Sequence, residues 1–184
     1  MKPTPAAVED LKAMRTESLR IAGEKAGADR GGDRVIEVFN PYTETAIGSV
    51  PKATPDEVRR AIAIGHAYRA RLTRFERASI LNRAASLVRE RAAAIAQLIS
   101  AESGLCIKDG LYEAGRVADV LGYGASEALH DDGEVFSCDL TPHGKKRRVY
   151  TQRSPLLGVI SAITPFNHPM NQVAHKVVPS IATN

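Results

Sequence analysis

An asparagine and a histidine stand between two prolines near the end of the chain, in the segment ITPFNHP that ends at Pro169. Pro165 stops an apolar run, and Pro169 suits the first turn of a helix, because proline has no backbone N–H to leave unpaired there. The two prolines therefore stiffen the turn that carries Asn167 and His168. A carboxamide held rigidly at such a turn can donate an N–H to an oxygen that gains negative charge in a reaction. We therefore expect Asn167 to be an oxyanion-stabilising residue.

The turn should connect a strand to a helix. Residues 156–163 are almost all apolar or small, which is typical of a strand buried on both faces of a parallel sheet. Residues 170–182 suggest a helix, with Asn167 or His168 near its cap. In open α/β sheets, ligands bind beyond the carboxyl ends of the strands, where this turn would lie. One strand and one helix cannot form a doubly wound sheet, so we expect the sheet to need sequence beyond Asn184.

This part of the chain resembles the aldehyde dehydrogenase superfamily. The matching motifs are RSPLLGVI, then ITPFNHP, then a helix with Lys176 and Pro179. The resemblance extends over most of the chain but reaches only the amino-terminal part of the family pattern. It implies an α/β fold with a Rossmann-type cofactor domain, in which Asn167 donates its amide to the oxyanion of a thiohemiacetal. A prolyl turn that only caps a buried strand–helix unit is the alternative.

The implied reaction is the oxidation of a small aldehyde to its carboxylic acid. A Cys thiolate is the nucleophile that attacks the aldehyde, and a nicotinamide cofactor is the oxidant. NAD is the expected cofactor and NADP the alternative. The cofactor-binding residues that the resemblance implies are Ile163, Thr164, Pro165, Phe166 and Asn167.

The family's cofactor-binding Lys, glycine-rich helix start, general-base Glu and nucleophilic Cys would all follow Asn184. Neither Cys106 nor Cys138 matches the catalytic position, and neither has an evident base or helix start beside it. We therefore expect these 184 residues to be the front portion of a longer enzyme, without dehydrogenase activity of their own.

Two further segments, YEAGRVADVL and FNHPMNQVAHKVVPSIATN, are most similar to the branch of the family that oxidises phosphonoacetaldehyde. Under that resemblance, Arg116 and His168 are candidate contacts for the phosphonate group. From spacing alone, Arg116 would instead pair with Glu113 or Asp119 on the same helix, and His168 would only shield the turn. A dehydrogenase for a semialdehyde or lactaldehyde, and a non-catalytic assembly module, are the alternative functions.

The chain divides into three expected regions. Residues 1–131 supply N-terminal helices and a hairpin of the cofactor-binding domain, residues 132–153 an oligomerisation hairpin, and residues 154–184 a truncated first strand–helix unit of the dinucleotide-binding sheet. The second region has strand-like runs at 135–140 and 147–153 around a turn. It resembles the family hairpin that adds to a neighbouring subunit, which predicts a homodimer or homotetramer. Such a hairpin alone is marginal in water.

Helices are expected to dominate the first region. Apolar periodicity predicts an amphipathic helix over residues 8–22, and a hairpin should follow, with strands at 35–39 and 45–50. The next helix should carry Val58, Ala61, Ile62, Gly65, Tyr68 and Leu72 on one face. Another should run from Thr73 to Gly104. Both begin at capping boxes, Thr54 with Glu57 and Thr73 with Glu76. A last helix should cover residues 107–129, with Leu111, Ala114, Ala118, Leu121 and Ala125 facing inward.

The composition suits a soluble globular protein with a core, since 43% of the residues are apolar and 25% are charged. No apolar run approaches the roughly 20 residues that cross a bilayer, and the start of the chain lacks the apolar region of a signal peptide. A cytoplasmic location is therefore expected, with no membrane partner. A net charge of +4 and 5% aromatic residues make nucleic acid a poor candidate partner. The expected ligand is a small anionic aldehyde, and no metal site is expected.

Overall fold

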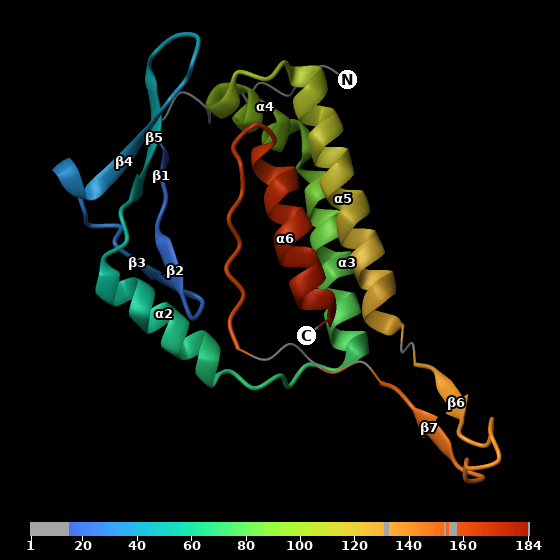
Figure 1. The fold of residues 1–184 in the computed structure, drawn as a ribbon. Helices are drawn as coiled ribbons and strands as arrows, with labels where there is room; N and C mark the ends of the chain where they lie inside the picture. Colours follow the sequence, from blue (N-terminus) through green and yellow to red (C-terminus); the bar gives the residue numbers. More distant parts are fainter. Residues whose placement is uncertain (1–14, 131–132, 153, 155–157, 184) are drawn as a thin grey trace.

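The computed structural model describes residues 15–130, 133–152, 154 and 158–183. Its elements are β1 (Arg15–Thr16), β2 (Leu19–Ile21), β3 (Glu24–Ala26), the short 3₁₀ helix η1 (Gly32–Arg34), β4 (Val35–Phe39), β5 (Ala46–Pro51), α2 (Pro55–Ala67), α3 (Arg74–Glu90), α4 (Ala92–Ser103), α5 (Ile107–Leu129), β6 (Val135–Ser137), β7 (Arg148–Tyr150) and α6 (Pro169–Thr183). Figure 1 shows that the strands β1–β5 and α2 form one lobe and that α3, α5 and α6 form a helix bundle, while the β6–β7 hairpin projects away from both.

The predicted hairpin near the start of the chain is confirmed. β4 and β5 pair in an antiparallel manner, and β1 adds to β5 in parallel, so the sheet order is β1-β5-β4. Asn40 shapes the turn, because its side-chain oxygen accepts hydrogen bonds from the backbone N–H of Tyr42 at 2.9 Å and of Thr43 at 3.0 Å.

The amphipathic helix predicted over residues 8–22 is wrong where the structure describes it. Residues 15–16 and 19–21 are strands, and residues 8–14 lie outside the described residues. β2 pairs with β3 through a turn in which Ala22 has a φ of 53° and Gly23 a φ of 84°. These positive φ values cannot continue a right-handed helix, so the apolar spacing reflects a tight hairpin instead.

Both predicted capping boxes are present. The Thr54 and Thr73 side chains accept the backbone N–H of Glu57 and Glu76, and each glutamate carboxylate accepts the backbone N–H of its threonine. The single helix expected from Thr73 to Gly104 is divided, however. Arg91 has φ −105° and ψ 11°, and separates α3 from α4. Gly104 ends α4 in the left-handed conformation with a φ of 76°, as expected.

The core lies between α3, α5 and α6, and alanine predominates in it, which lets the helices approach closely. Its buried residues are Ala78, Leu81, Ala85 and Val88 from α3, Ala114, Val117, Ala118, Leu121, Ala125 and Ala128 from α5, and Ala174, Val178 and Ala182 from α6. Four of the five positions predicted to face inward on α5 are therefore buried. Leu111 is the exception, because it is exposed although it lies near the start of α5 at the same helical spacing.

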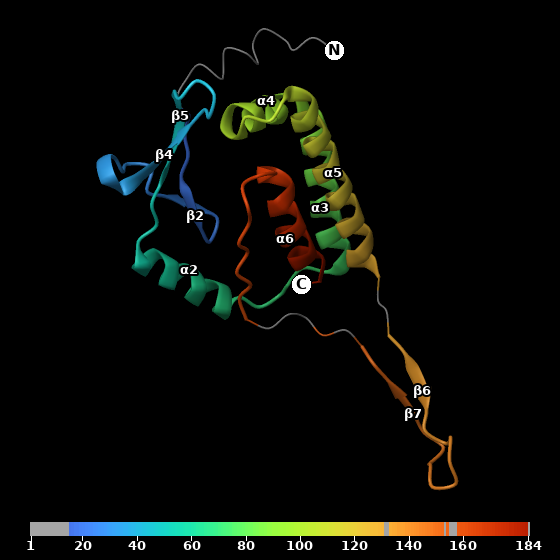
Figure 2. The same ribbon diagram turned by 45° about the horizontal axis from the view of Figure 1, so that its top comes forward.

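Two predicted elements, the helix α2 and the strand before α6, lack the neighbouring elements in the described structure that would cover or pair with them. None of the residues of α2 is buried, although its apolar residues share one face. Residues 159–165 have no regular secondary structure and pair with no described strand, and Gly158 has a φ of 91°, so the expected interior strand is not formed there. Residues 156–157 lie outside the described residues. A strand needs neighbours to bond its backbone, and the described strands lie elsewhere. Figures 1 and 2 show this segment running between α2 and the helix bundle.

The strand-like runs predicted at 135–140 and 147–153 form the β6–β7 hairpin, with shorter strands than expected. Val135, Phe136 and Ser137 pair with Tyr150, Val149 and Arg148 in an antiparallel register. Every residue of the two strands is exposed. Among the residues that the structure describes, no helix has both the length and the apolar character to cross a membrane.

Candidate active site at the start of helix α6

The helix α6 begins at Pro169, as the sequence predicts. Proline at the first position has no N–H to satisfy, and the N–H of Gln172 bonds to the carbonyl oxygen of His168 at 3.0 Å. The N–H groups of Met170 and Asn171 both donate to Oε1 of Glu113, each at 2.9 Å. The carboxylate that caps α6 therefore comes from α5 and not from the turn itself.

Glu113 also contacts the side chain of the turn. Its Oε2 lies 3.3 Å from Nδ1 of His168, which can donate to it when the proton is on that nitrogen. The Glu113 side chain is only 1% exposed, whereas the His168 side chain is 46% exposed. A negative charge is favourable at the positive end of a helix dipole. The contact with Glu113 shows that His168 helps to anchor the turn as well as cover it.

Sequence reasoning considered Glu113 only as a partner of Arg116, and that pairing is wrong. A signal for its real role was present, because Glu113 lies four residues before the buried Val117 and three after the buried Gly110. A carboxylate on the buried face of a helix requires hydrogen-bond partners. The sequence could have indicated that Glu113 bonds across the core, but not to which element.

Asn167 lies on the exposed side of this turn. Within the described part of the chain, its side chain accepts and donates no hydrogen bond, so its amide N–H groups are available to a ligand. The backbone of residues 163–166 is likewise unpaired among the described residues, and Ile163 and Phe166 are 84% and 88% exposed. The five expected cofactor-binding residues are consecutive in the sequence, and all of them except the half-buried Thr164 are exposed. Their role in cofactor binding stays a prediction.

Arg116 lies on the exposed surface of α5, three residues after Glu113. Its Nη1 is 3.3 Å from the Tyr112 hydroxyl, and its guanidinium carbon lies 5.9 Å from the centre of the Tyr112 ring. These interactions with Tyr112 raise the pKa of Arg116, first through the hydrogen bond. Asp119 makes a smaller electrostatic contribution, and no ion pair between Arg116 and Asp119 is described. No described contact joins Arg116 to His168.

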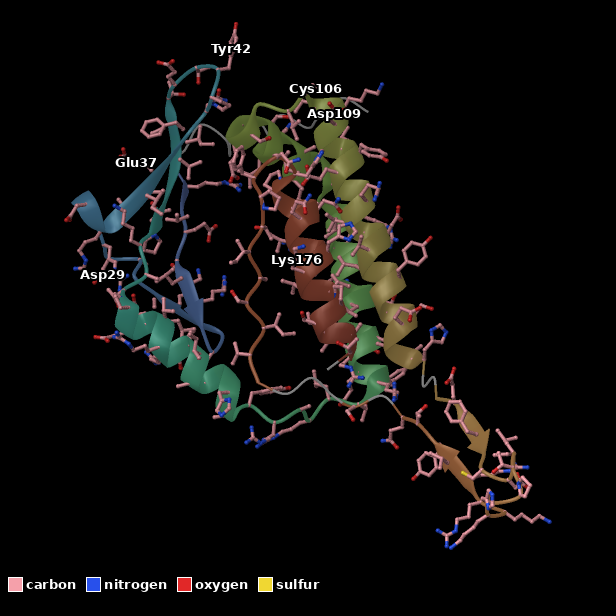
Figure 3. The ribbon with its side chains drawn as sticks, viewed as in Figure 1. Asp29, Glu37, Tyr42, Cys106, Asp109 and Lys176 are labelled. Atoms are coloured by element: carbon pink, nitrogen blue, oxygen red, sulfur yellow. The ribbon has the colours of Figure 1, made fainter. Side chains whose placement is uncertain are left out.

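The cysteines were expected to lack a helix start, and for Cys106 this is wrong. Cys106 is the residue that precedes α5, and it is exposed. Figure 3 shows it near Asp109 at the end of α5 beside α4, far from the β6–β7 hairpin. Cys138 lies in the hairpin and is also a free thiol. Within the described ranges, no group of three His, Cys, Asp or Glu side chains could hold a metal ion.

Comparison with known proteins identifies the fold. The chain is 38% identical over 150 residues to aspartate-semialdehyde dehydrogenase 1 of Pseudomonas canavaninivorans, an alignment that covers 80% of this chain and 32% of that protein. Aldehyde dehydrogenase 21 of Physcomitrella patens, solved with the reaction product succinate, matches with a TM-score of 0.86 and 30% identity, over 93% of this chain and 35% of that one.

A second solved structure agrees with the first. The NADP-dependent glyceraldehyde-3-phosphate dehydrogenase of Bacillus halodurans, complexed with NADP, matches with a TM-score of 0.78 and 31% identity, over 91% of this chain and 36% of that one. The chain therefore spans about a third of the length of these proteins. The profile of the aldehyde dehydrogenase family matches residues 28–184. These matches confirm the predicted α/β fold, and the chain belongs to the aldehyde dehydrogenase family.

Proposed function

We propose that this chain supplies the oxyanion-stabilising Asn167 of an NAD- or NADP-dependent dehydrogenase that oxidises a small anionic aldehyde. The observation that carries the proposal is that the Asn167 side-chain amide is exposed and, in the described part of the chain, unpaired on an anchored turn. It is exposed, it makes no hydrogen bond within the described residues, and it belongs to the turn whose His168 and following helix start are anchored to Glu113. A preorganised donor of this kind stabilises charge that develops on a carbonyl oxygen.

The thiol nucleophile and the general base are not among the residues of this turn. We propose that sequence outside these 184 residues supplies a Cys thiolate, which adds to the aldehyde carbon while the carbonyl oxygen becomes an oxyanion. Asn167 donates an N–H to that oxyanion. The non-catalytic alternative, an assembly module, would leave an exposed and unpaired carboxamide at the turn without a role.

The residues of the extended segment fit a nicotinamide cofactor, because their backbone N–H and C=O groups are unpaired and accessible. In this proposal, residues 163–167 hold the cofactor beside the reacting aldehyde. A nicotinamide held there would supply the hydride acceptor that the oxidation needs. The solved relative that contains NADP supports a dinucleotide, and this chain's choice between NAD and NADP is left to measurement.

An anionic substrate is supported by the names of the similar proteins. Aspartate semialdehyde, succinate and glyceraldehyde 3-phosphate all carry a carboxylate or a phosphate. Arg116 is the cation of this chain that we assign to such a group, with His168 as a second donor. The guanidinium has one described hydrogen bond, to Tyr112, so its remaining N–H groups can bind an anion bidentately. We propose phosphonoacetaldehyde as the specific substrate; a semialdehyde or lactaldehyde is the alternative.

The assembly is proposed to be a homodimer or homotetramer. The β6–β7 hairpin projects from the body (Figure 1), and Val149 and Tyr150 on β7 are exposed. A two-stranded ribbon is marginal alone, and both of its edges can bond another strand. A strand of a second copy would satisfy one of those edges.

The test of the proposed function is Asn167→Ala in the enzyme that carries this chain together with the Cys and Glu segments. Loss of one oxyanion donor typically costs 10²- to 10³-fold in kcat, so we expect a decrease of about that size with little change in the Kd for NAD or NADP. Asn167→Asp is the matched variant, because it keeps the shape but removes the N–H donors. An unchanged kcat in both variants would exclude Asn167 from the reaction.

A further inference from the structure

We propose that Glu113 is a positioning residue for the reaction: from α5, it fixes the point at which α6 begins and thereby the place of Asn167. The proposal rests on the proposed function, since it assumes that Asn167 is the oxyanion donor. Glu113 itself has no described contact with Asn167, so its effect passes through the turn.

The Glu113 carboxylate is buried, and its hydrogen-bond partners come from a distant part of the chain. Glu113 is among the largest fully buried side chains of the described residues. All of its hydrogen bonds cross to another element, because its partners are 55 to 58 residues away in the sequence. They are the N–H groups of Met170 and Asn171 and the ring of His168. A buried carboxylate with these bonds ties one end of α6 to the middle of α5.

The turn itself supplies no side chain that caps the first N–H groups of α6. The residue before Pro169 is a histidine, and its carbonyl oxygen accepts only the N–H of Gln172. The N–H groups of Met170 and Asn171 would be unpaired without Glu113. Unsatisfied N–H groups in a half-buried position are costly, so the start of α6 would move or unwind to find other acceptors.

The backbone between Met170, which Glu113 binds, and Asn167 is short and stiff. Only His168 and Pro169 separate Asn167 from Met170. Pro169 has a fixed φ, and a residue before proline is restricted to extended backbone. A displacement of Met170 is therefore transmitted to Asn167. An oxyanion donor must lie within a few tenths of an ångström of its working distance, and a misplacement of about 1 Å can cost about 10²-fold in rate.

The experiment compares single and double variants of the complete enzyme. Glu113→Ala removes the acceptor and should lower kcat by about 10- to 100-fold. Glu113→Gln keeps a carbonyl oxygen for the two N–H groups and should remain within about threefold of the parent enzyme. Val178→Ala is the control for stability, because it removes buried methyl groups from the same contact between α5 and α6, away from the turn. It should leave kcat unchanged below the unfolding temperature.

A double-variant cycle separates positioning from general damage. If Glu113 acts through Asn167, Glu113→Ala should cause no further loss of kcat when Asn167 is already alanine. An equal loss in both backgrounds would overturn the proposal. Hydrogen exchange gives an independent readout: the amides of Met170 and Asn171 should exchange faster in Glu113→Ala, and not in Val178→Ala.

The outcomes distinguish this proposal from the proposed function. If Asn167→Ala alone has no effect on kcat, the function assigned to Asn167 fails, whatever the exchange rates show. If Asn167→Ala lowers kcat but Glu113→Ala does not, the function stands and the positioning role of Glu113 is wrong. If Glu113→Gln is as inactive as Glu113→Ala, the negative charge and not the acceptor geometry is required, and the positioning role is also wrong.

Discussion

Gly124 of α5 lies directly against Val178 of α6. A Cβ added to Gly124 would stand 2.3 Å from Cγ1 of Val178, which is far inside van der Waals contact, and 3.5 Å from Cδ1 of Leu81. The absence of a side chain at this position therefore sets how closely α6 can approach α5. This packing lies along the bodies of the two helices, whereas the Glu113 carboxylate contacts the start of α6.

We expect Gly124→Ala to destabilise the protein, because its methyl group overlaps Val178 and forces the helices apart. Overpacking of this kind costs about 1–3 kcal/mol in the free energy of unfolding. Gly122→Ala is the matched control, since an added Cβ there meets nothing within 4 Å. Alanine favours helix by up to about 1 kcal/mol over glycine, so Gly122→Ala should stabilise. Denaturant unfolding measures both, and the double variant Gly124→Ala with Val178→Ala should recover part of the loss.

The pair of Arg30 and Glu57 predicts a specific dependence of stability on pH. Two guanidinium nitrogens of Arg30 contact the Glu57 carboxylate, one of them at 3.0 Å from Oε2. The hydrogen bond from Arg30, followed by that from the Thr54 backbone, lowers the pKa of Glu57 from 4.5 to about 2. The carboxylate therefore stabilises the fold fully above pH 4.5, and this contribution is lost as the pH falls toward about 2.

Glu57→Gln isolates this effect, because glutamine can still complete the capping box but carries no charge. We expect the variant to be less stable than the parent at neutral pH, with a difference that shrinks as the pH falls from 4.5 to about 2. Unfolding free energies measured across this range provide the check. Asp56→Asn is the control, since Asp56 pairs with Arg59 at the exposed surface. A constant difference between Glu57→Gln and the parent would show that Arg30 does not hold the charge.

Arg116 should determine the preference for an anionic substrate. Hydrogen bonds to a charged group are worth about 1.5–3 kcal/mol, so Arg116→Ala should raise the KM for phosphonoacetaldehyde by about 10- to 100-fold. The KM for propanal, which has no anionic group, should change little. Tyr112→Phe tests whether the hydrogen bond to Tyr112 positions the Arg116 guanidinium, since it removes the hydroxyl 3.3 Å from Arg116 Nη1 and keeps the ring. Equal changes in KM for both aldehydes after Arg116→Ala would refute the assignment.

The β6–β7 hairpin should carry a contact between subunits. Val149→Lys places a charge on the exposed surface of β7, where it opposes the addition of another strand. We expect a shift toward monomers, measured by sedimentation velocity. Tyr42→Lys is the control, because Tyr42 is 92% exposed at the turn between β4 and β5, far from the hairpin in Figure 3. A parent protein that is monomeric at all concentrations would contradict the assignment.

The features that the sequence predicted correctly depend on residues that lie close together in the sequence, within about one helical turn. Thr54 with Glu57, and Thr73 with Glu76, close their hydrogen bonds over three residues, so the residue types alone indicate where α2 and α3 begin. Pro169 and Gly104 mark a helix start and a helix end for equally local reasons. The motif around Asn167 was enough to indicate the family, which the comparisons confirm. The division of the chain into three regions, and the roles of the individual site residues, stay predictions.

The tertiary structure decided what depends on partners far away in the sequence. Residues 158–165 have the composition of a buried strand, but no described strand lies beside them to bond their backbone. The apolar residues of α2 have a helical period, yet the period does not say what will cover them, and they remain exposed. Glu113 is the clearest case: its position on a helix is evident from the sequence, whereas its bonds to the start of α6 exist only because α5 and α6 pack together. Local hydrogen bonds are encoded by residue type and spacing, and contacts across the core are encoded only by the complete fold.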